Sequence, residues 1–381
     1  MPESKAGGIK MEFSIGTKEL AKGLYRAQGI VEKKTAMPIL SNALFEASGD
    51  GKLSITATDL EVGMTCEHKA SIKKEGSITI SARHLYEIVK NLPGDEVTVK
   101  KLDNNWAEIK CEKVEYKMMG MAADEFQGLP SIKKAKMFKV DPATMKDMID
   151  KTVYAVSTDE TRYNLNGSYL EKVGEKGFRM VATDGHRLSM IDAKLAEDPK
   201  KAVFGEGVII PKKGLMEIKR LIESEAGDCL LGIDGSNMVF KMSDVTVVMR
   251  LLDGQFPEYR QVVPDNQKIT LNIDRKQLVD SLRRVSILSS DRTLGLKLTL
   301  KPGTLRVNTS NPDLGEAKED IEIKYSGSGM NVGFNARYLL DALATISTDT
   351  IDLSLEDDLS PGVFRPAGEL VYTCVVMPMR L

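Results

Sequence analysis

The chain repeats one local pattern three times, and this repeat restricts the possible fold more than any other feature of the sequence. A short apolar/polar alternation leads into a helix-starting residue and a helical stretch at residues 13–27, 138–151 and 271–284. The middle copy has the clearest start signal, because Asp141 precedes Pro142 and the first helical turn needs no N–H group there. Apolar residues recur every three or four positions in each stretch, so each helix should bury one face.

A second strand-and-helix pattern follows each first one after about 65 residues, at 78–89, 208–218 and 332–343. Short alternating strands fill the intervals, among them a single strand at 63–72 and a hairpin around the turn 49–51. Proline-bearing stretches at 126–130 and 256–264 are typical of linkers. We therefore expect an α+β fold of three similar domains, each a doubled motif of a helix plus antiparallel strands. The predicted divisions are a disordered extension at 1–10 and domains at 11–130, 131–260 and 261–381.

Composition excludes several classes of protein. Hydrophobic residues make up 42% and charged residues 28% of the 381 residues, which is typical of a globular chain. No apolar run approaches the roughly 20 residues of a membrane helix, and residues 1–10 lack the apolar core of a signal peptide, so we expect a cytoplasmic protein. The four cysteines form no CxxC or zinc-type spacing and should be buried free thiols.

Positive charge concentrates on the predicted helices although the net charge is −2. The six helical windows hold 16 Lys and Arg against 10 Asp and Glu. Lys18, Lys22 and Arg26 recur every four residues and should form an exposed basic stripe. Such faces can simply be solvated. If all six helices share one side of the molecule, however, they form a surface that attracts phosphates without reading sequence. No row of aromatic residues suits single-stranded bases, so duplex is favoured.

The motif at 181–188 places Asp184, His186 and Arg187 close together, as a catalytic site would. A partial copy at 57–60 keeps the Ala-Thr-Asp part and lacks Gly-His-Arg. Asp184 is therefore interpreted as part of a repeated turn, and His186 and Arg187 as additions specific to the second copy. The sequence contains no phosphate-binding glycine loop, serine elbow or metalloprotease motif.

Three functional hypotheses follow from the residues. The first is a protein that binds duplex DNA through its basic helices and has no chemistry of its own, the second a hydrolase that uses Asp184 and His186, and the third a monomeric adaptor with solvated basic faces. The C-terminal segment 375–381 contains two Met and one Pro, and Met suits adaptable binding surfaces. A pocket shared by this segment and the 181–188 motif would use both singular stretches of the chain.

Several motifs resemble those of the bacterial DNA polymerase III beta subunit family, the replication sliding clamps. They are 183–188 (Thr-Asp-Gly-His-Arg-Leu), 256–260 (Phe-Pro-Glu-Tyr-Arg), 375–381, 38–40 (Pro-Ile-Leu), Arg162-Tyr163 and 165–167 (Leu-Asn-Gly). The resemblance covers residues 11–381. It implies a non-catalytic processivity factor with the DNA-clamp fold, in which a head-to-tail homodimeric ring encircles duplex DNA with its helices inside and its sheets outside. A separate ATP-dependent machine loads such rings, so no cofactor and no metal are expected here.

The resemblance also implies partners and sites. The partners are the replicative polymerase alpha subunit, the clamp-loader delta subunit, and other polymerases and repair proteins that carry a Gln-Leu-type binding motif. The implied peptide pocket consists of Leu165, Thr183, Gly185, His186, Arg187, Leu188, Pro257, Val262, Tyr338, Val375, Val376, Met377, Pro378 and Met379. The implied DNA contacts are Lys34, Arg83, Asp159, Tyr163 and Asn164. The implied dimer interface consists of Lys113, Tyr116 and Met118 on one side, and of Ile287, Leu288, Glu316, Glu319 and Asp320 on the other.

The chain departs from the family pattern at three of these sites. Asp159 and Asn164 stand where the best-known member of the family has a Gln and a Tyr, and Gln261 replaces an Arg at the pocket rim. The resemblance therefore implies altered DNA contacts and an altered peptide preference.

Overall fold

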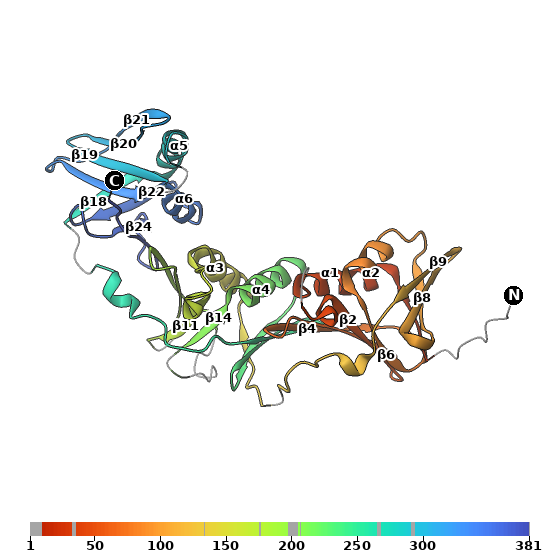
Figure 1. Ribbon diagram of the computed structural model, residues 1–381. Coiled ribbons are helices and arrows are strands. Elements are labelled where there is room, and N and C mark those ends of the chain that lie inside the picture. The colour runs from red at the N-terminus through yellow and green to blue at the C-terminus, as the bar shows by residue number, and fades with distance from the viewer. Residues whose placement is uncertain are drawn as a thin grey trace. The chain divides into compact units, whose positions relative to one another are not determined.

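The computed structural model describes most of the chain (Figure 1). The described residues are 10–32, 36–132, 134–174, 177–196, 205, 207–264, 268–290 and 294–380. Residues 1–9 of the predicted extension and Lys34 lie outside them. No helix within the described residues is long and apolar enough to cross a membrane.

Six α-helices occur in this part of the chain, and each begins at a predicted junction of strand and helix. They are α1 (Thr17–Ile30), α2 (Ala82–Val89), α3 (Pro142–Thr152), α4 (Lys212–Ser224), α5 (Arg275–Ser286) and α6 (Ala336–Ala344). Asp274 caps α5 by accepting a hydrogen bond from the Gln277 N–H at 2.7 Å, and Asn335 accepts from the Arg337 N–H at 2.9 Å on α6. These side chains satisfy N–H groups that a helix start leaves unpaired, as the sequence predicted.

The strands form four antiparallel sheets. Two of them contain the first part of the chain. The five-stranded sheet has the order β5 (Ser71–Lys74), β1 (Met11–Gly16), β7 (Glu96–Lys101), β8 (Trp106–Cys111), β9 (Val114–Met119). The first eight-stranded sheet has the order β10 (Phe138–Val140), β15 (Cys229–Asp234), β16 (Asn237–Met242), β17 (Val245–Arg250), β4 (Val62–Lys69), β3 (Lys52–Thr58), β2 (Asn42–Ser48), β6 (Gly76–Ser81).

The other two sheets contain the later part of the chain. The second eight-stranded sheet has the order β14 (Val208–Pro211), β11 (Gly167–Val173), β12 (Gly177–Thr183), β13 (Arg187–Ala193), β25 (Tyr372–Val376), β24 (Gly362–Pro366), β23 (Thr350–Leu355), β18 (Ile269–Asp274). The four-stranded sheet has the order β21 (Gly315–Glu322), β20 (Thr304–Asn311), β19 (Gly295–Lys301), β22 (Met330–Asn335). The α+β class and the antiparallel strands agree with the sequence prediction.

Both eight-stranded sheets cross the predicted domain boundaries. In the first, β17 pairs with β4, and in the second, β13 pairs with β25. Residue contacts group these sheets and their helices into two compact units. Unit 1 contains the described residues up to Pro142 together with Met216–Leu251, and unit 2 contains the other described residues. Each unit contains one part of the middle repeat, because main-chain hydrogen bonds join that part to the first repeat in unit 1 and to the third repeat in unit 2. The boundaries predicted near 130 and 260 describe the sequence repeat.

One predicted strand is divided in the structure. The alternation at 63–72 predicted a single strand, but the strand breaks at Ala70, whose N–H group donates to the Gly51 carbonyl at 2.9 Å. Before the break β4 pairs with β3 and β17, and after it β5 pairs with β1. The alternation continues through the break, so the sequence pattern did not reveal it.

The apolar faces of the helices cover the sheets as predicted. In unit 1, α1 packs on α2 and on β3 and β4, and its Leu20, Leu24 and Ala27 are fully buried. A Cβ atom on Gly23 would lie 2.6 Å from Nε2 of His68, so this glycine permits the close approach of α1 to β4. In unit 2, α5 and α6 pack together in the same way.

Arg26 departs from the predicted basic stripe. Only 3% of this residue is exposed, although the prediction grouped it with Lys18 and Lys22. Eight helical residues turn a side chain through about 80°, which carries Arg26 away from the stripe toward the core. There its Nη1 lies 2.9 Å from Oδ2 of Asp244, and its Nη2 contacts Glu225. The prediction of an exposed Arg26 was wrong.

The two carboxylates that face Arg26 make this contact dependent on pH. Burial by itself would raise the pKa of Asp244 and of Glu225. The hydrogen bonds and charge of Arg26, joined by those of Lys22 at Glu225, together outweigh burial and lower both pKa values below the ordinary 3.8 and 4.5. A carboxylate with a lowered folded-state pKa stabilises the fold above its unfolded pKa, and this stability is lost as the pH falls through the folded pKa. The contribution is therefore complete at neutral pH and declines below about pH 4.5.

Replacing Arg26 with Met should lower the free energy of unfolding by about 3–5 kcal/mol at pH 7, because two partly buried carboxylates lose their cation. Urea unfolding at pH 7 and pH 3 measures the effect, and the difference between variant and wild type should shrink at pH 3. The matched control is Lys22→Met. Lys22 pairs with Glu225 from an exposed position, so its loss should cost less than about 1 kcal/mol. Equal losses in the two variants would contradict this account.

Candidate functional site

A tight turn joins β12 to β13 and carries the centre of the 181–188 motif. Oδ1 of Asp184 accepts hydrogen bonds from the N–H groups of His186 at 3.0 Å and Arg187 at 3.1 Å. Oγ1 of Thr183 accepts from the Gly185 N–H at 3.1 Å and donates to the Arg187 carbonyl at 2.6 Å. The side chains of the Thr-Asp pair therefore fix the turn.

The turn between β3 and β4 has the same four hydrogen bonds. Oδ1 of Asp59 accepts from the N–H groups of Glu61 at 3.0 Å and Val62 at 2.6 Å. Oγ1 of Thr58 accepts from the Leu60 N–H at 3.0 Å and donates to the Val62 carbonyl at 3.4 Å. The interpretation of Thr-Asp as repeated scaffold is confirmed. Leu60, the third residue of this turn, has a φ of +79°. Its counterpart in the second copy is Gly185, and a glycine adopts this conformation without strain.

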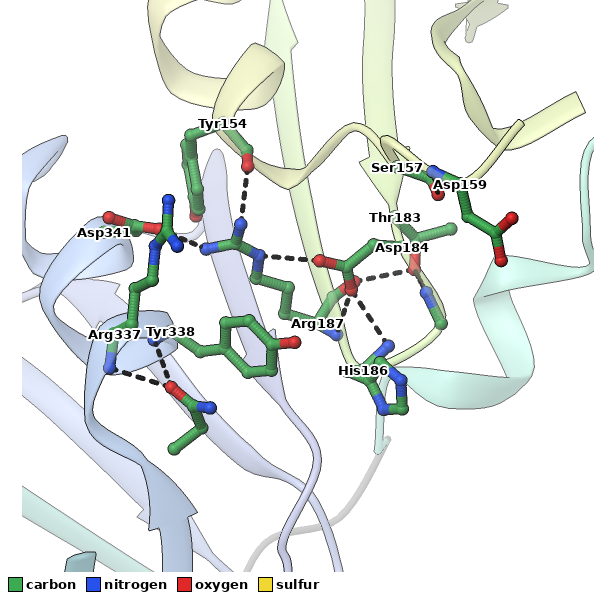
Figure 2. Close-up of polar contacts among 12 residues, drawn as sticks. Tyr154, Ser157, Asp159, Thr183, Asp184, His186, Arg187, Arg337, Tyr338 and Asp341 are labelled. Carbon is green, nitrogen blue, oxygen red and sulfur yellow. Dashed lines mark hydrogen bonds and ion pairs between the residues drawn. The ribbon is translucent and has the colours of Figure 1, made fainter. Parts of the chain in front are cut away.

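Arg187 is specific to the second copy, since Val62 holds its place in the first. Its guanidinium donates to Asp184 at 3.0 Å, to Asp341 of α6 at 2.5 Å and to the Tyr154 carbonyl at 2.8 Å (Figure 2). Burial by itself would lower the pKa of Arg187, but the two carboxylates outweigh it and raise the pKa. Arg187 is thus a permanently charged group that joins the turn to α6 and to the segment after α3.

The aromatic ring of Tyr338 covers this arginine. The Arg187 guanidinium lies 4.6 Å from the ring centre, and the His186 ring stacks on Tyr338 at 6.2 Å and 15°. The His186 imidazole makes no hydrogen bond with any residue the structure describes. Asp184 is occupied by main-chain N–H groups and Arg187, whereas a catalytic Asp must orient its His. The arrangement therefore does not support the hydrolase hypothesis.

An apolar cavity of about 120 Å³ lies beside the turn. Its lining residues are Leu165, Thr183, Gly185, Arg187, Leu188, Pro257, Tyr259, Val262, Val375 and Met377. All except Tyr259 belong to the predicted peptide pocket. A buried apolar cluster that includes Val181, Leu188 and Val375 supports the cavity floor. The cavity can take an apolar side chain, and its wall is held by two paired strands, β13 and β25.

Tyr259 was missed because the stretch 256–264 was interpreted as a linker. It begins the short 3-10 helix at Tyr259–Val262, and only 3% of it is exposed. Its hydroxyl contacts Glu171 and accepts from Nη1 of Arg179 at 3.2 Å. Burial raises the pKa of Tyr259 to about 12, so the hydroxyl stays protonated at neutral pH. Its position between Pro257 and Val262 was the available signal. Gln261 is exposed in the same short helix.

The remaining predicted pocket residues do not line this cavity. Val376 is fully buried in β25, where it pairs with Arg187. Pro378 and Met379 line a separate cavity of about 630 Å³, and the Met379 N–H donates to the Gly333 carbonyl at 2.8 Å. His186 and Tyr338 line a polar cavity of about 740 Å³. This polar cavity also contains residues that the prediction did not assign to the pocket, namely Asp159, Arg162, Lys212, Arg337 and Asp341.

The predicted DNA contacts are distributed between the two units. Arg83 is exposed on α2 in unit 1. In unit 2, Tyr163 is 44% exposed, and Nδ2 of Asn164 donates to the Gln255 carbonyl at 2.8 Å. The carboxylate of Asp159 accepts from the Thr161 hydroxyl at 2.7 Å and from its N–H at 3.0 Å, and these hydrogen bonds lower the pKa of Asp159. Asp159 is therefore an anion on an exposed loop, which does not favour contact with phosphate.

The predicted interface residues lie at two sheet edges. Lys113, Tyr116 and Met118 are on or beside β9, the last strand of its sheet, and Tyr116 is 41% exposed. Glu316, Glu319 and Asp320 are on β21, also a last strand. Ile287 follows α5 directly and is 75% exposed, and Leu288 comes next. Arg284 donates to Glu319, and Arg306 donates to Asp320.

The structure also tests the prediction made for the cysteines. All four cysteines are buried free thiols, as predicted. Within the described residues, no group of three or more His, Cys, Asp or Glu side chains could hold a metal ion.

Comparison with known proteins defines the class. Three family models match consecutive parts of the chain: the N-terminal domain of the DNA polymerase III beta subunit at 11–130, its central domain at 139–258 and its C-terminal domain at 260–380. The beta sliding clamp of Caulobacter vibrioides is 35% identical over 377 residues, which cover 97% of this chain and 100% of the relative. The beta sliding clamp of Pseudomonas aeruginosa is 33% identical over 374 residues, with 97% and 100% coverage.

Solved structures agree with this result. The Caulobacter crescentus beta sliding clamp has a TM-score of 0.92 at 33% identity, covering 98% of this chain and 100% of that one. The Bartonella birtlesii sliding clamp, solved bound to griselimycin, has a TM-score of 0.91 at 32% identity, with 97% and 100% coverage. The chain belongs to the DNA polymerase III beta subunit family, the beta sliding clamps. It is a non-catalytic processivity factor of DNA replication.

The two matched turns allow a paired test of the Arg187 contacts. Asp59→Ala removes the turn hydrogen bonds of the first copy, where Val62 stands in place of Arg187, and should cost about 1 kcal/mol, as the loss of a similar cap does. Asp184→Ala also removes a carboxylate partner of the half-buried Arg187 and should cost about 2–4 kcal/mol. Denaturant unfolding measures both losses. Equal losses would mean that Arg187 does not depend on Asp184.

Proposed function

We propose that two copies of this chain pair head-to-tail into a ring around duplex DNA, and that the apolar cavity beside the 183–187 turn binds peptide segments of partner proteins. The partners are the replicative polymerase alpha subunit, the clamp-loader delta subunit, and other polymerases and repair proteins with a clamp-binding motif. We place the protein in the cytoplasm, where bacterial replication occurs. The observation that carries the ring is the pairing of strands across the repeats.

In each repeat one strand follows the Thr-Asp turn, or follows Ser310-Asn311, which takes the place of Thr-Asp in the third repeat. In the first repeat this strand, β4, pairs with β17, and in the second, β13 pairs with β25. The corresponding strand of the third repeat is β21, which has no partner in its sheet on that side. The strand that corresponds to β17 and β25 is β9, and it is also a last strand. Two copies can pair both edges by placing β9 of one against β21 of the other. The same contact then forms a second time and closes a ring of two copies.

The paired edges also suggest a register for this contact. Val114 and Val245 each follow a two-residue hairpin turn. Ser310 and Asn311 correspond to Thr58 and Asp59, because Asn311 accepts from the N–H group two residues further on, as Asp59 does. Thr58 pairs with Gly63, and Ser310 pairs with Glu316. Gly63 pairs with Val248, three residues after Val245. The equivalent pair across the interface is Glu316 with Lys117. Two residues further along the strands, Lys318 would face Glu115. Both are pairs of opposite charge, which stabilise facing strands.

The predicted basic surface supports the DNA part of the proposal. Lys18 on α1 and Lys276 and Arg283 on α5 are exposed and make no ion pair with a described residue. Lys22 and Arg284 pair with Glu225 and Glu319, so part of the helical charge is neutralised. A surface with moderate positive charge suits a protein that must hold DNA and still move along it.

The ring predicts retention that depends on DNA topology. After loading by a bacterial clamp loader with ATP, the protein should stay on a closed circular duplex through gel filtration at high salt. Cutting the circle once should release it, because a ring slides off a free end while a surface-bound protein does not. The loss of bound protein after cleavage measures this. Equal retention on circular and linear DNA would reject the ring and favour a monomeric adaptor.

The peptide pocket predicts a separable defect. Met377 lines the apolar cavity, and Met379, two residues further along the chain, lines the separate cavity of about 630 Å³. Met377→Ala with Met379→Ala should weaken the binding of a fluorescent Gln-Leu-type peptide by about tenfold or more, since buried apolar contacts dominate such sites. The oligomeric state should not change. Met216→Ala on α4 is the control, because Met216 is exposed and lies outside these cavities. Loss of the dimer in the double variant would show that the pocket is misplaced.

A further inference from the structure

The polar cavity adjoins the apolar cavity through the 183–187 turn. Arg187 lines both, while Thr183 and Gly185 face the apolar cavity and Asp184 and His186 face the polar one. A peptide anchored by an apolar side chain in the small cavity therefore meets the polar cavity on one side of its anchor. The volume of about 740 Å³ allows several residues to enter it.

The acidic side chains of the polar cavity are already engaged. Asp184 and Asp341 both accept hydrogen bonds from Arg187. Asp159 accepts from Thr161 and lies 3.8 Å from Nε of Arg162. These contacts leave the three carboxylates with protein donors, so they offer little to a ligand.

Two basic side chains of the same cavity remain available. Arg337 on α6 is exposed, and Lys212 is the first residue of α4. Neither makes an ion pair or a side-chain hydrogen bond with a residue that the structure describes. Arg337 precedes Asp341 by four residues and so shares a helix face with it. Oδ2 of Asp341, however, lies 2.5 Å from Nη1 of Arg187, which takes up this carboxylate (Figure 2).

The cavity as a whole carries four basic and three acidic side chains. A ligand carboxylate would thus enter a site with a net positive charge and two basic groups that lack protein partners. A ligand ammonium would meet the same two groups and no free carboxylate. The charge distribution distinguishes the two kinds of ligand.

We propose that Arg337 and Lys212 make this clamp select partner peptides that carry Asp or Glu next to the apolar anchor, on the side that faces α6. This inference rests on the proposed peptide-binding function of the apolar cavity. It names two specificity-determining residues and one chemical class of partner, namely an acidic flank on an apolar peptide motif.

The expected size of the effect follows from the exposure of Arg337. An exposed pair of opposite charges contributes little, so one acidic residue should tighten binding by about two- to fivefold at low salt. The gain should fall at high ionic strength because salt screens exposed charges. The apolar anchor should keep its own affinity under both conditions.

Fluorescence anisotropy with the full-length protein tests this at 50 mM and 500 mM salt. Three Gln-Leu-type peptides share one anchor and differ by Glu before it, Glu after it, or Gln at both positions. One of the two Glu peptides should bind more tightly than the Gln peptide at low salt. Arg337→Gln should remove most of this difference, and Arg337→Glu should make a Lys-flanked peptide the better ligand. Lys212→Gln should reduce the difference as well.

Lys324→Gln is the matched control, because it makes the same charge change at an exposed residue of unit 2 outside the cavities described above. It should keep the preference for Glu. Equal affinity of wild type for the Glu and Gln peptides would overturn this inference while leaving the peptide site intact. Failure of all three peptides to bind would instead reject the proposed peptide function.

Discussion

Main-chain pairing between strands of neighbouring repeats is the contact on which the rest of the molecule depends. The strands β4 and β17 join the first repeat to part of the second, and β13 and β25 join another part of the second to the third. Strand pairing satisfies main-chain groups along a whole edge, so these joints are continuous sheets rather than contacts between finished domains. Among the end strands of the four sheets, β9 is the counterpart of β17 and β25, and β21 is the counterpart of β4 and β13. Pairing of the same kind between β9 of one copy and β21 of another would close a ring of two copies.

The candidate peptide site is a consequence of one of these joints. The pairing of β13 with β25 brings the C-terminal strand beside the turn that contains Arg187. Arg187 then reaches Asp341 on α6, so a residue added to a repeated turn fixes helix and turn together. In the first repeat the same turn holds Val62, whose backbone pairs with Met249 in β17. The repeated turn provides the geometry at both places, and the side chain at its end decides whether a binding surface results.

Much of the fold followed from local patterns in the sequence. Helix starts such as Asp141-Pro142 and Asp274 are determined by neighbouring residues, and the structure places them where the pattern does. The partner of β4 could not be predicted, because an alternating strand does not indicate which distant strand it pairs with. Arg26 was assigned to the wrong face because a spacing of four drifts around the helix, and because Asp244 lies far away in the sequence. The polar cavity combines Arg162, Lys212 and Arg337, whose separations in the chain carry no pattern at all.

Cross-linking across the proposed β9–β21 contact tests the central claim most directly. Lys117→Cys with Glu316→Cys places two thiols on directly facing residues, whose Cα atoms would be about 4.5–5.5 Å apart, within the range of a disulfide. The native cysteines are buried and should not compete. Oxidation should convert the double variant into a covalent dimer on a denaturing gel. Glu115→Cys with Glu316→Cys, on a diagonal of about 7–8 Å, should cross-link far less. Absence of a dimer in the first variant, or equal cross-linking in both, would contradict the proposed pairing of repeats between two copies.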